Sequence, residues 1–210
     1  MNDRKLKSRT LHTRLERGFS LVEVCVSTAI IMVICAMAVF TLQPALQNAN
    51  CDAAMDQVLG QLRQAREYAI TNRRYVQVSF ATVANIPQIT LTQRNDLTSG
   101  AGFTNPVLST VAIHAPEQFF YGGGPDTPDA LGQPLAGGGI EFGGISGGPI
   151  GGMLFQSDGE MVNGVTYLPI NGTVFLGQTG PNTTARALTV LGATGRVRAW
   201  KGSGTGWAQY

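Results

Sequence analysis

The chain has 210 residues, of which 43% are hydrophobic and 13% charged, and its formal net charge is +2. This composition excludes an intrinsically disordered chain and is typical of a globular or membrane-anchored protein with one domain and an appended segment. The three cysteines lie too far apart to form a metal-binding motif or a disulfide framework.

The first eighteen residues form a basic head. They contain six basic and two acidic residues, so the rest of the chain holds nine basic and eleven acidic residues. Positive charge directly before an apolar segment keeps that end in the cytoplasm and directs the following part across the membrane. Nucleic-acid binding by this head is the alternative, and the adjoining apolar run argues against it.

An apolar run follows from Phe19 to Leu42, with Glu23 near its start. At about 1.5 Å per residue, a helix of this length exceeds a hydrocarbon core of about 30 Å. A secretory signal peptide would explain the basic head and the small residues Ala36 and Ala38, which have the spacing of a cleavage site. A simple membrane anchor also fits the apolar content. Neither explains Glu23, because an intramembrane carboxylate is unfavourable by on the order of 3 kcal/mol.

The segment RGFSLVE, residues 17–23, resembles the leader-peptidase site of the type IV pilin and type II secretion pseudopilin superfamily. In that family, cleavage falls between Gly and Phe, the new N-terminal Phe is N-methylated, and a Glu is the fifth mature residue. The resemblance therefore implies a leader of residues 1–18 that is removed after Gly18. It also implies N-methylation of Phe19 and a role for Glu23 in assembly.

The helical pattern continues beyond the apolar run to about Asn72. Apolar residues recur there and predict a buried stripe on one side of the helix, formed by Leu46, Ala49, Ala53, Leu59, Leu62, Ala65 and Ala69. We therefore predict one long helix, which is membrane-spanning over residues 19–42 and amphipathic over residues 43–72. Pro44 should kink this helix.

Residues 73–210 are predicted to form a β-rich head, because the apolar period changes to two. Alternation predicts strands at 75–80, 89–92, 107–113, 186–191 and 196–200. Asp158-Gly159 predicts a turn, and Asn171-Gly172 between apolar segments predicts a β-hairpin. The glycine-dense residues 121–152 predict a long surface loop. The expected fold class is α+β, with a long N-terminal, partly transmembrane helix packed on an antiparallel sheet.

The order of helical stem and sheet, followed by the segments SDGE, NGTVFL and ARALTVLGATGRVRAW, is similar to the H-type minor pseudopilins and their FimT-like type IV pilus counterparts. The resemblance implies a structural subunit of a type II secretion pseudopilus or a type IV pilus, acting at the tip or in initiation. The implied partners are other pilins or pseudopilins, prepilin peptidase and the inner-membrane assembly platform. The implied location is the bacterial inner membrane with a periplasmic head, followed by a periplasmic pseudopilus or an extracellular pilus.

The sequence contains no motif for catalysis or cofactor binding. HExxH, GxSxG and CxxC are absent, and the glycine-dense segment has no GxxxxGK[ST]. Of the two histidines, His12 lies in the expected leader, and His114 beside Ala-Pro is typical of a structural loop. Asp126 and Asp129 offer too few oxygens for Ca²⁺. The sequence therefore predicts no enzyme, no metal site, no cofactor and no small-molecule substrate.

Basic residues dominate the C-terminal end. No acidic residue follows Glu160, whereas four basic residues remain with two tryptophans among them: Arg186, Arg196, Arg198, Lys201, Trp200 and Trp207. Guanidinium groups suit phosphate, and tryptophan can stack on bases. One interpretation is a DNA-contact patch on a pilus tip that serves DNA uptake. The other is a solvated strand face with the tryptophans packed into the sheet.

Overall fold

The computed structural model of the protein describes residues 19–84, 86–95, 105–113, 118–119, 139–143, 145–146, 152–178, 185–202 and 206–210. The expected leader, including Gly18, lies outside the described residues, and so do His114, Asp126 and Asp129. The chain divides into two compact units, Met1–Gln43 and Pro44–Tyr210. Helix α1, Leu21–Asn72, contributes to both units.

In the first unit, α1 exposes its apolar side chains. Every described residue from Phe19 to Gln43 is exposed, and the most apolar window of α1 has a mean hydropathy of 2.5 with none of it buried in the chain. By its length and composition this helix could cross a membrane once. The predicted apolar helix is confirmed.

In the second unit, one face of α1 is buried against the head. Its buried residues are Cys51, Ala54, Met55, Val58, Leu59, Leu62, Ala65 and Ala69. The predicted stripe is confirmed from Leu59 onward and wrong before it, because Leu46, Ala49 and Ala53 are exposed. The step from Ala53 to Leu59 covers six residues, which rotates a helix by about 600°, roughly 240° past a whole turn. The buried face instead continues back to Cys51 in smaller steps.

Helix α1 ends at Asn72, as predicted. Arg73 turns left-handed with φ of 52°, and the N–H of Arg74 donates to the carbonyl oxygen of Ala69 at 3.2 Å. This pairing satisfies a carbonyl that the helix terminus would otherwise leave open. Pro44 lies inside the helix, and the kink expected there stays a prediction.

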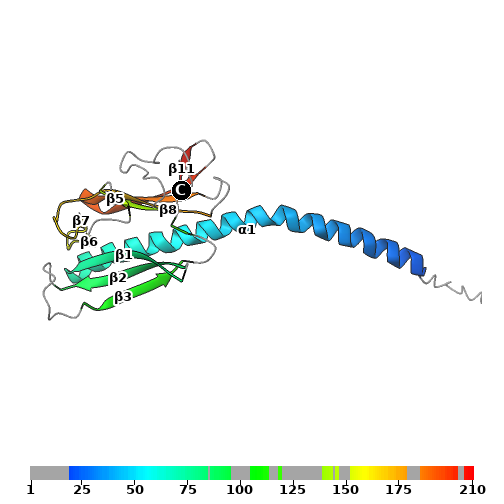
Figure 1. Ribbon diagram of the computed structural model, residues 1–210, viewed down its shortest axis with the longest axis horizontal. Coiled ribbons are helices and arrows are strands. Elements are labelled where there is room, and N and C mark those ends of the chain that lie inside the picture. Colours follow the sequence, from blue (N-terminus) through cyan, green and yellow to red (C-terminus); the bar gives the residue numbers. More distant parts are fainter. Residues whose placement is uncertain are drawn as a thin grey trace, which may run out of the picture. The chain divides into compact units, whose positions relative to one another are not determined.

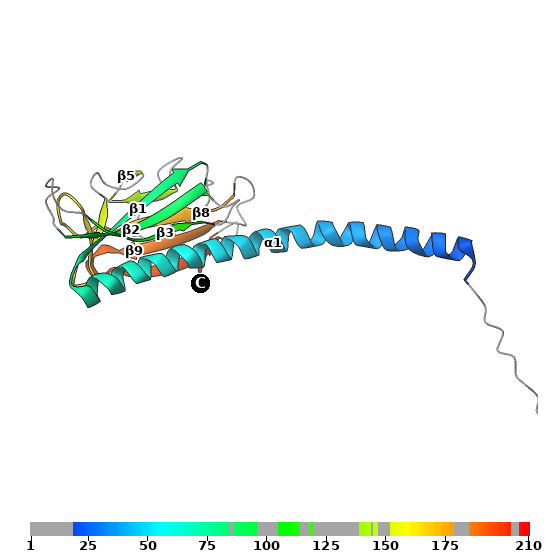
Figure 2. The ribbon, with the colours of Figure 1, turned by 90° about the horizontal axis from the view of Figure 1, so that it is seen from below.

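Two antiparallel sheets form the rest of the described head (Figures 1 and 2). The first has the order β3-β2-β1-β6-β7. Its strands are β1 (Tyr75–Val83), β2 (Ile86–Arg94), β3 (Val107–Ala112), β6 (Met153–Phe155) and β7 (Met161–Asn163). The second has the order β11-β10-β9-β8-β4-β5. Its strands are β4 (Ile140–Phe142), β5 (Ile145–Ser146), β8 (Gly172–Leu176), β9 (Arg186–Leu191), β10 (Arg196–Gly202) and β11 (Trp207–Gln209).

A common core joins α1 to both sheets. Met55 and Leu62 of α1, Val76 of β1, and Phe142 and Leu188 of the second sheet belong to it, and all five are fully buried. The five predicted strands are present, and the predicted turn forms where Gly159 N–H donates to the Gln156 carbonyl at 2.9 Å. The α+β fold class is confirmed.

The predicted hairpin at Asn171-Gly172 is wrong. Strand β8 begins at Gly172 and pairs with β4 and β9, so the segment before Asn171 is not its partner. The side-chain oxygen of Asn171 accepts a hydrogen bond from the Gly192 N–H at 2.8 Å. A Cβ at Gly172 would overlap the ring of Phe142. The Asn-Gly pair therefore makes contacts with distant segments. The local sequence pattern does not distinguish this role from a turn.

The surface loop predicted for residues 121–152 is wrong near its end. There, β4 pairs with β8 and β5, and Ile140, Glu141 and Phe142 are all buried. Pairing with β8 gives this short apolar segment a backbone partner and a place in the core. The glycines around this segment gave the sequence the pattern of a loop. Most of the remaining residues of the predicted loop lie outside the described residues.

Candidate functional site

The start of α1 places Phe19 and Glu23 four residues apart. Phe19 is 81% exposed, and Glu23 is exposed in the first turn, where its backbone N–H donates to the carbonyl oxygen of Ser20 at 2.9 Å. The positive end of the helix dipole favours a carboxylate at this position. Glu23 is also the single acidic residue among residues 19–43. Its charge therefore stands alone in an otherwise apolar stretch.

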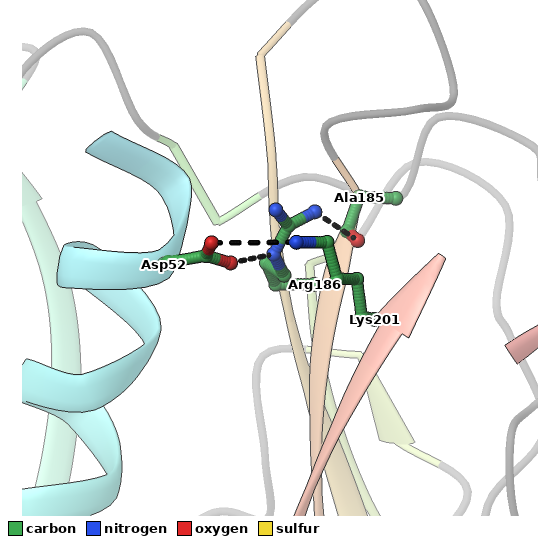
Figure 3. A network of polar contacts seen from close by, with 4 residues as sticks. All are labelled: Asp52, Ala185, Arg186 and Lys201. Carbon is green, nitrogen blue, oxygen red and sulfur yellow. Dashed lines mark hydrogen bonds and ion pairs between the residues drawn. The ribbon is translucent and has the colours of Figure 1, made fainter. Parts of the chain in front are cut away.

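An ion-pair network in the head joins α1 to β9 and β10 (Figure 3). The Nε of Arg186 donates to Oδ1 of Asp52 at 2.5 Å, and Nζ of Lys201 lies 3.4 Å from Oδ2 of the same carboxylate. The side chain of Arg186 is fully buried, that of Asp52 is 27% exposed and that of Lys201 is 43% exposed. A second guanidinium nitrogen of Arg186 donates to the carbonyl oxygen of Ala185 at 3.1 Å.

The pKa of Asp52 reflects this environment. Burial by itself raises the pKa of its carboxyl group, but the hydrogen bond and positive charge of Arg186, followed by those of Lys201, lower the pKa below its ordinary value. Asp52 is therefore ionised at neutral pH and compensates the buried guanidinium. Arg186 and Asp52 are 134 residues apart in sequence, so this pair fastens the helix to the sheet.

The four C-terminal basic residues differ in exposure and do not form one exposed patch. Arg186 and Lys201 are cross-strand partners, so they share a face of the sheet, and both contact Asp52 of α1. Arg198 is displaced from Lys201 by three positions and therefore lies on the opposite face. Arg186 is buried, Arg198 and Lys201 are half-buried, and Arg196, at the start of β10, is exposed. Buried Arg186 is not available to DNA.

The two tryptophans are partly packed into the sheet, which was the second interpretation of the C-terminal residues. The indole N–H of Trp200 donates to the hydroxyl of Thr189 at 2.9 Å, and the ring of Trp207 lies 6.1 Å from that of Phe175. Both tryptophans are half-buried. A half-buried, hydrogen-bonded indole contributes to the packing of the sheet.

Asp52 was missed by sequence reasoning, although a signal was present. It lies next to Cys51, at the margin of the buried face of α1. The residues one turn further along the helix, Met55 and Asp56, offer no positive charge. A carboxylate at the edge of a buried face with no cation one turn further along its helix needs a partner from elsewhere in the fold.

Gly195, the first residue of the GRVR segment, has a structural reason to be glycine. Its φ is +60°, and a Cβ there would overlap the carbonyl oxygen of Gly159. The turn between β9 and β10 consists of the short 3₁₀ helix η2 (Gly192–Thr194) and Gly195. Gly195 therefore shapes the turn that precedes β10.

We expect Gly195→Ala to lower the free energy of unfolding by about 1–3 kcal/mol, because it adds both backbone strain and a steric overlap. Gly60→Ala is the matched control, since a Cβ at this exposed helical position meets open space. That substitution should raise the free energy of unfolding by about 0.5–1 kcal/mol. Denaturant unfolding of the full chain in a neutral detergent measures both, and equal effects of the two substitutions would contradict the assignment.

Among the described residues, no three His, Cys, Asp or Glu side chains are grouped as a metal site. The chain has no match among protein-family models, curated proteins or solved structures. Its function is therefore inferred from its own residues.

Proposed function

We propose that the chain is a minor subunit of a type IV pilus or a type II secretion pseudopilus, cut after Gly18 and N-methylated at Phe19. The observation that carries the proposal is the place of RGFSLVE, directly after a basic head and directly before an apolar helix. The apolar side chains of this helix are exposed in the first unit, so they need a lipid or protein environment. A filament of packed helices would offer such an environment once the subunit has left the membrane.

In this proposal the subunit acts by assembly and not by catalysis. The chain would first cross the inner membrane, with its basic head in the cytoplasm and its β-rich head in the periplasm. Its partners would be prepilin peptidase, the inner-membrane assembly platform and other pilins or pseudopilins. Deletion of its gene distinguishes the two filament classes, because loss of secreted protein indicates a pseudopilus and loss of surface filaments indicates a pilus.

We expect Gly18→Ala to block removal of the leader. The peptidase of this superfamily cuts between Gly and Phe, and an added methyl group at the residue before the bond alters the substrate at the point of attack. Gel migration and mass spectrometry of the N-terminus measure the effect, and the variant should retain all eighteen leader residues. Ser20→Ala, on the other side of the cleavage site, is the control and should be processed normally. Normal processing of Gly18→Ala would contradict the proposal.

DNA binding by the head is the second candidate function. The observation that favours it is the exposure of Arg196, which can offer its guanidinium to phosphate. The burial of Arg186 reduces the number of contacts that the C-terminal residues could make. Binding through so few phosphate contacts would be weak and sensitive to salt.

A further inference from the structure

A cleft of about 640 Å³ opens in the head beside the turn that links β9 to β10. Among the described residues, three arginines line it, Arg63 and Arg66 from α1 and Arg196 from β10, together with one carboxylate, that of Glu67. Ile70 and Val197 add apolar surface. The cleft is therefore cationic at several points and apolar at others, and its volume is in the range of about 300–1,000 Å³ that ligand pockets occupy.

The helical side of the cleft is held in place by Arg66. Its Nε donates to the carbonyl oxygen of Thr194 at 3.1 Å and lies 3.3 Å from that of Gly159. These bonds connect α1 to the turn before β10 and to the turn between β6 and β7. Arg63, Arg66 and Ile70 recur at helical spacing, so one face of α1 supplies all three. Arg66 thus fixes the backbone of this side of the cleft before any ligand arrives, which reduces the entropy lost on binding.

The other two arginines form no ion pair within the described part of the head. Arg63 and Arg196 are both exposed, and neither forms an ion pair with another described residue. Two guanidinium groups from separate elements at one cleft favour an anion that both can reach. A planar carboxylate matches the donor geometry of guanidinium groups.

We propose that this cleft binds an acidic segment of a protein partner, in which a carboxylate side chain stands next to an apolar one. The carboxylate contacts Arg63 and Arg196, and the apolar neighbour packs on Ile70 and Val197. Inorganic phosphate or a nucleic-acid backbone would leave that apolar surface uncovered, so these ligands fit the cleft less well. The proposal goes beyond the filament function and holds whether or not the partner is another filament subunit.

The test is selection of peptides on the full chain in a neutral detergent. A phage library of random heptapeptides is panned on the unchanged protein, and the most enriched sequence is synthesised with a fluorescent label. We expect enrichment of sequences with Asp or Glu beside an apolar residue. The double variant Arg63→Gln with Arg196→Gln should bind the labelled peptide about tenfold more weakly or worse, because two charge-assisted contacts are lost.

Arg74→Gln is the matched control, because Arg74 is exposed just beyond the end of α1 and does not line the cleft. Its binding should equal that of the unchanged protein. A peptide with Asn or Gln in place of its acids should also bind about tenfold more weakly to the unchanged protein, a measurement that needs no folded variant. Enrichment without acidic residues, or equal binding by the double variant, would overturn the proposal. Displacement of the peptide by duplex DNA or inorganic phosphate at equal concentration would also overturn it, in favour of a general anion site.

Discussion

Replacement of Asp52 by alanine is expected to lower the free energy of unfolding of the head by about 3–5 kcal/mol. The substitution removes the carboxylate that the fully buried guanidinium of Arg186 contacts through its Nε. Removing one member of a buried pair is far more destabilising than removing both, since an uncompensated charge remains in the interior. Denaturant unfolding of the full chain in a neutral detergent, followed by the fluorescence of Trp200 and Trp207, measures the change.

Three further variants separate the effect of losing this ion pair on the free energy of unfolding from the general effect of a substitution. Asp56→Ala removes an exposed carboxylate one turn further along α1 and should change the free energy of unfolding by less than about 0.5 kcal/mol. Asp52→Asn retains a hydrogen-bond acceptor and should be intermediate. Asp52→Ala combined with Arg186→Met removes both charges and should recover part of the loss. Equal stability of Asp52→Ala and Asp56→Ala would show that the pair does not hold the helix to the sheet.

The same pair should make stability depend on pH. The folded state lowers the pKa of Asp52 below its unfolded value, so the unfolded state binds the proton more tightly. The contribution of Asp52 is therefore fully present above the unfolded pKa and is lost as pH falls through the lower, folded pKa. Over that acidic range, Asp52→Ala should lose less stability than the unchanged chain does.

Replacement of Glu23 by alanine is expected to leave membrane insertion and cleavage after Gly18 intact, yet to reduce entry into filaments by about tenfold or more. In the proposed assembly, Glu23 pairs with the protonated amine of a mature Phe19, its own or that of a neighbouring subunit. N-methylation leaves that amine able to carry charge. Only a neighbour docked in register would supply its amine, so the pairing would select one register. Loss of the carboxylate removes that selection and leaves the amine without its counter-charge.

The amount of subunit in sheared filaments, relative to the membrane pool, measures the effect of Glu23→Ala. Glu23→Gln keeps the size of the side chain without its charge and should fail in the same way. Ser27→Ala, one turn further along the exposed apolar stretch, is the control and should assemble normally. Unchanged incorporation of Glu23→Ala would contradict the pairing role, whereas failure of cleavage would point to a defect before assembly.

Two kinds of local pattern in the sequence were sufficient for the helix and for five of the strands. Apolar residues at helical spacing predicted one helix that ends at Asn72, and alternation predicted strands such as β1 and β9. These predictions succeeded because hydrophobic periodicity follows from the geometry of the element itself. The residue pattern around Gly18, Phe19 and Glu23 is also local, which is why the proposed processing site could be read without the fold.

Contacts between distant segments were decided only by the tertiary structure. Asn171-Gly172 has the pattern of a turn. The Asn171 side chain instead accepts a hydrogen bond from Gly192, and the absence of a Cβ at Gly172 leaves room for the ring of Phe142. Arg186 has the pattern of a surface cation, yet Asp52 lies 134 residues away and neutralises it inside the head. The cleft likewise unites Arg63 with Arg196, which no spacing along the chain connects. By itself, the sequence determined the long helix, five of the strands and where processing is expected, because all of these follow from local patterns. Tertiary packing decided which charges are buried, paired or exposed, because that depends on which faces of α1 and the sheets meet.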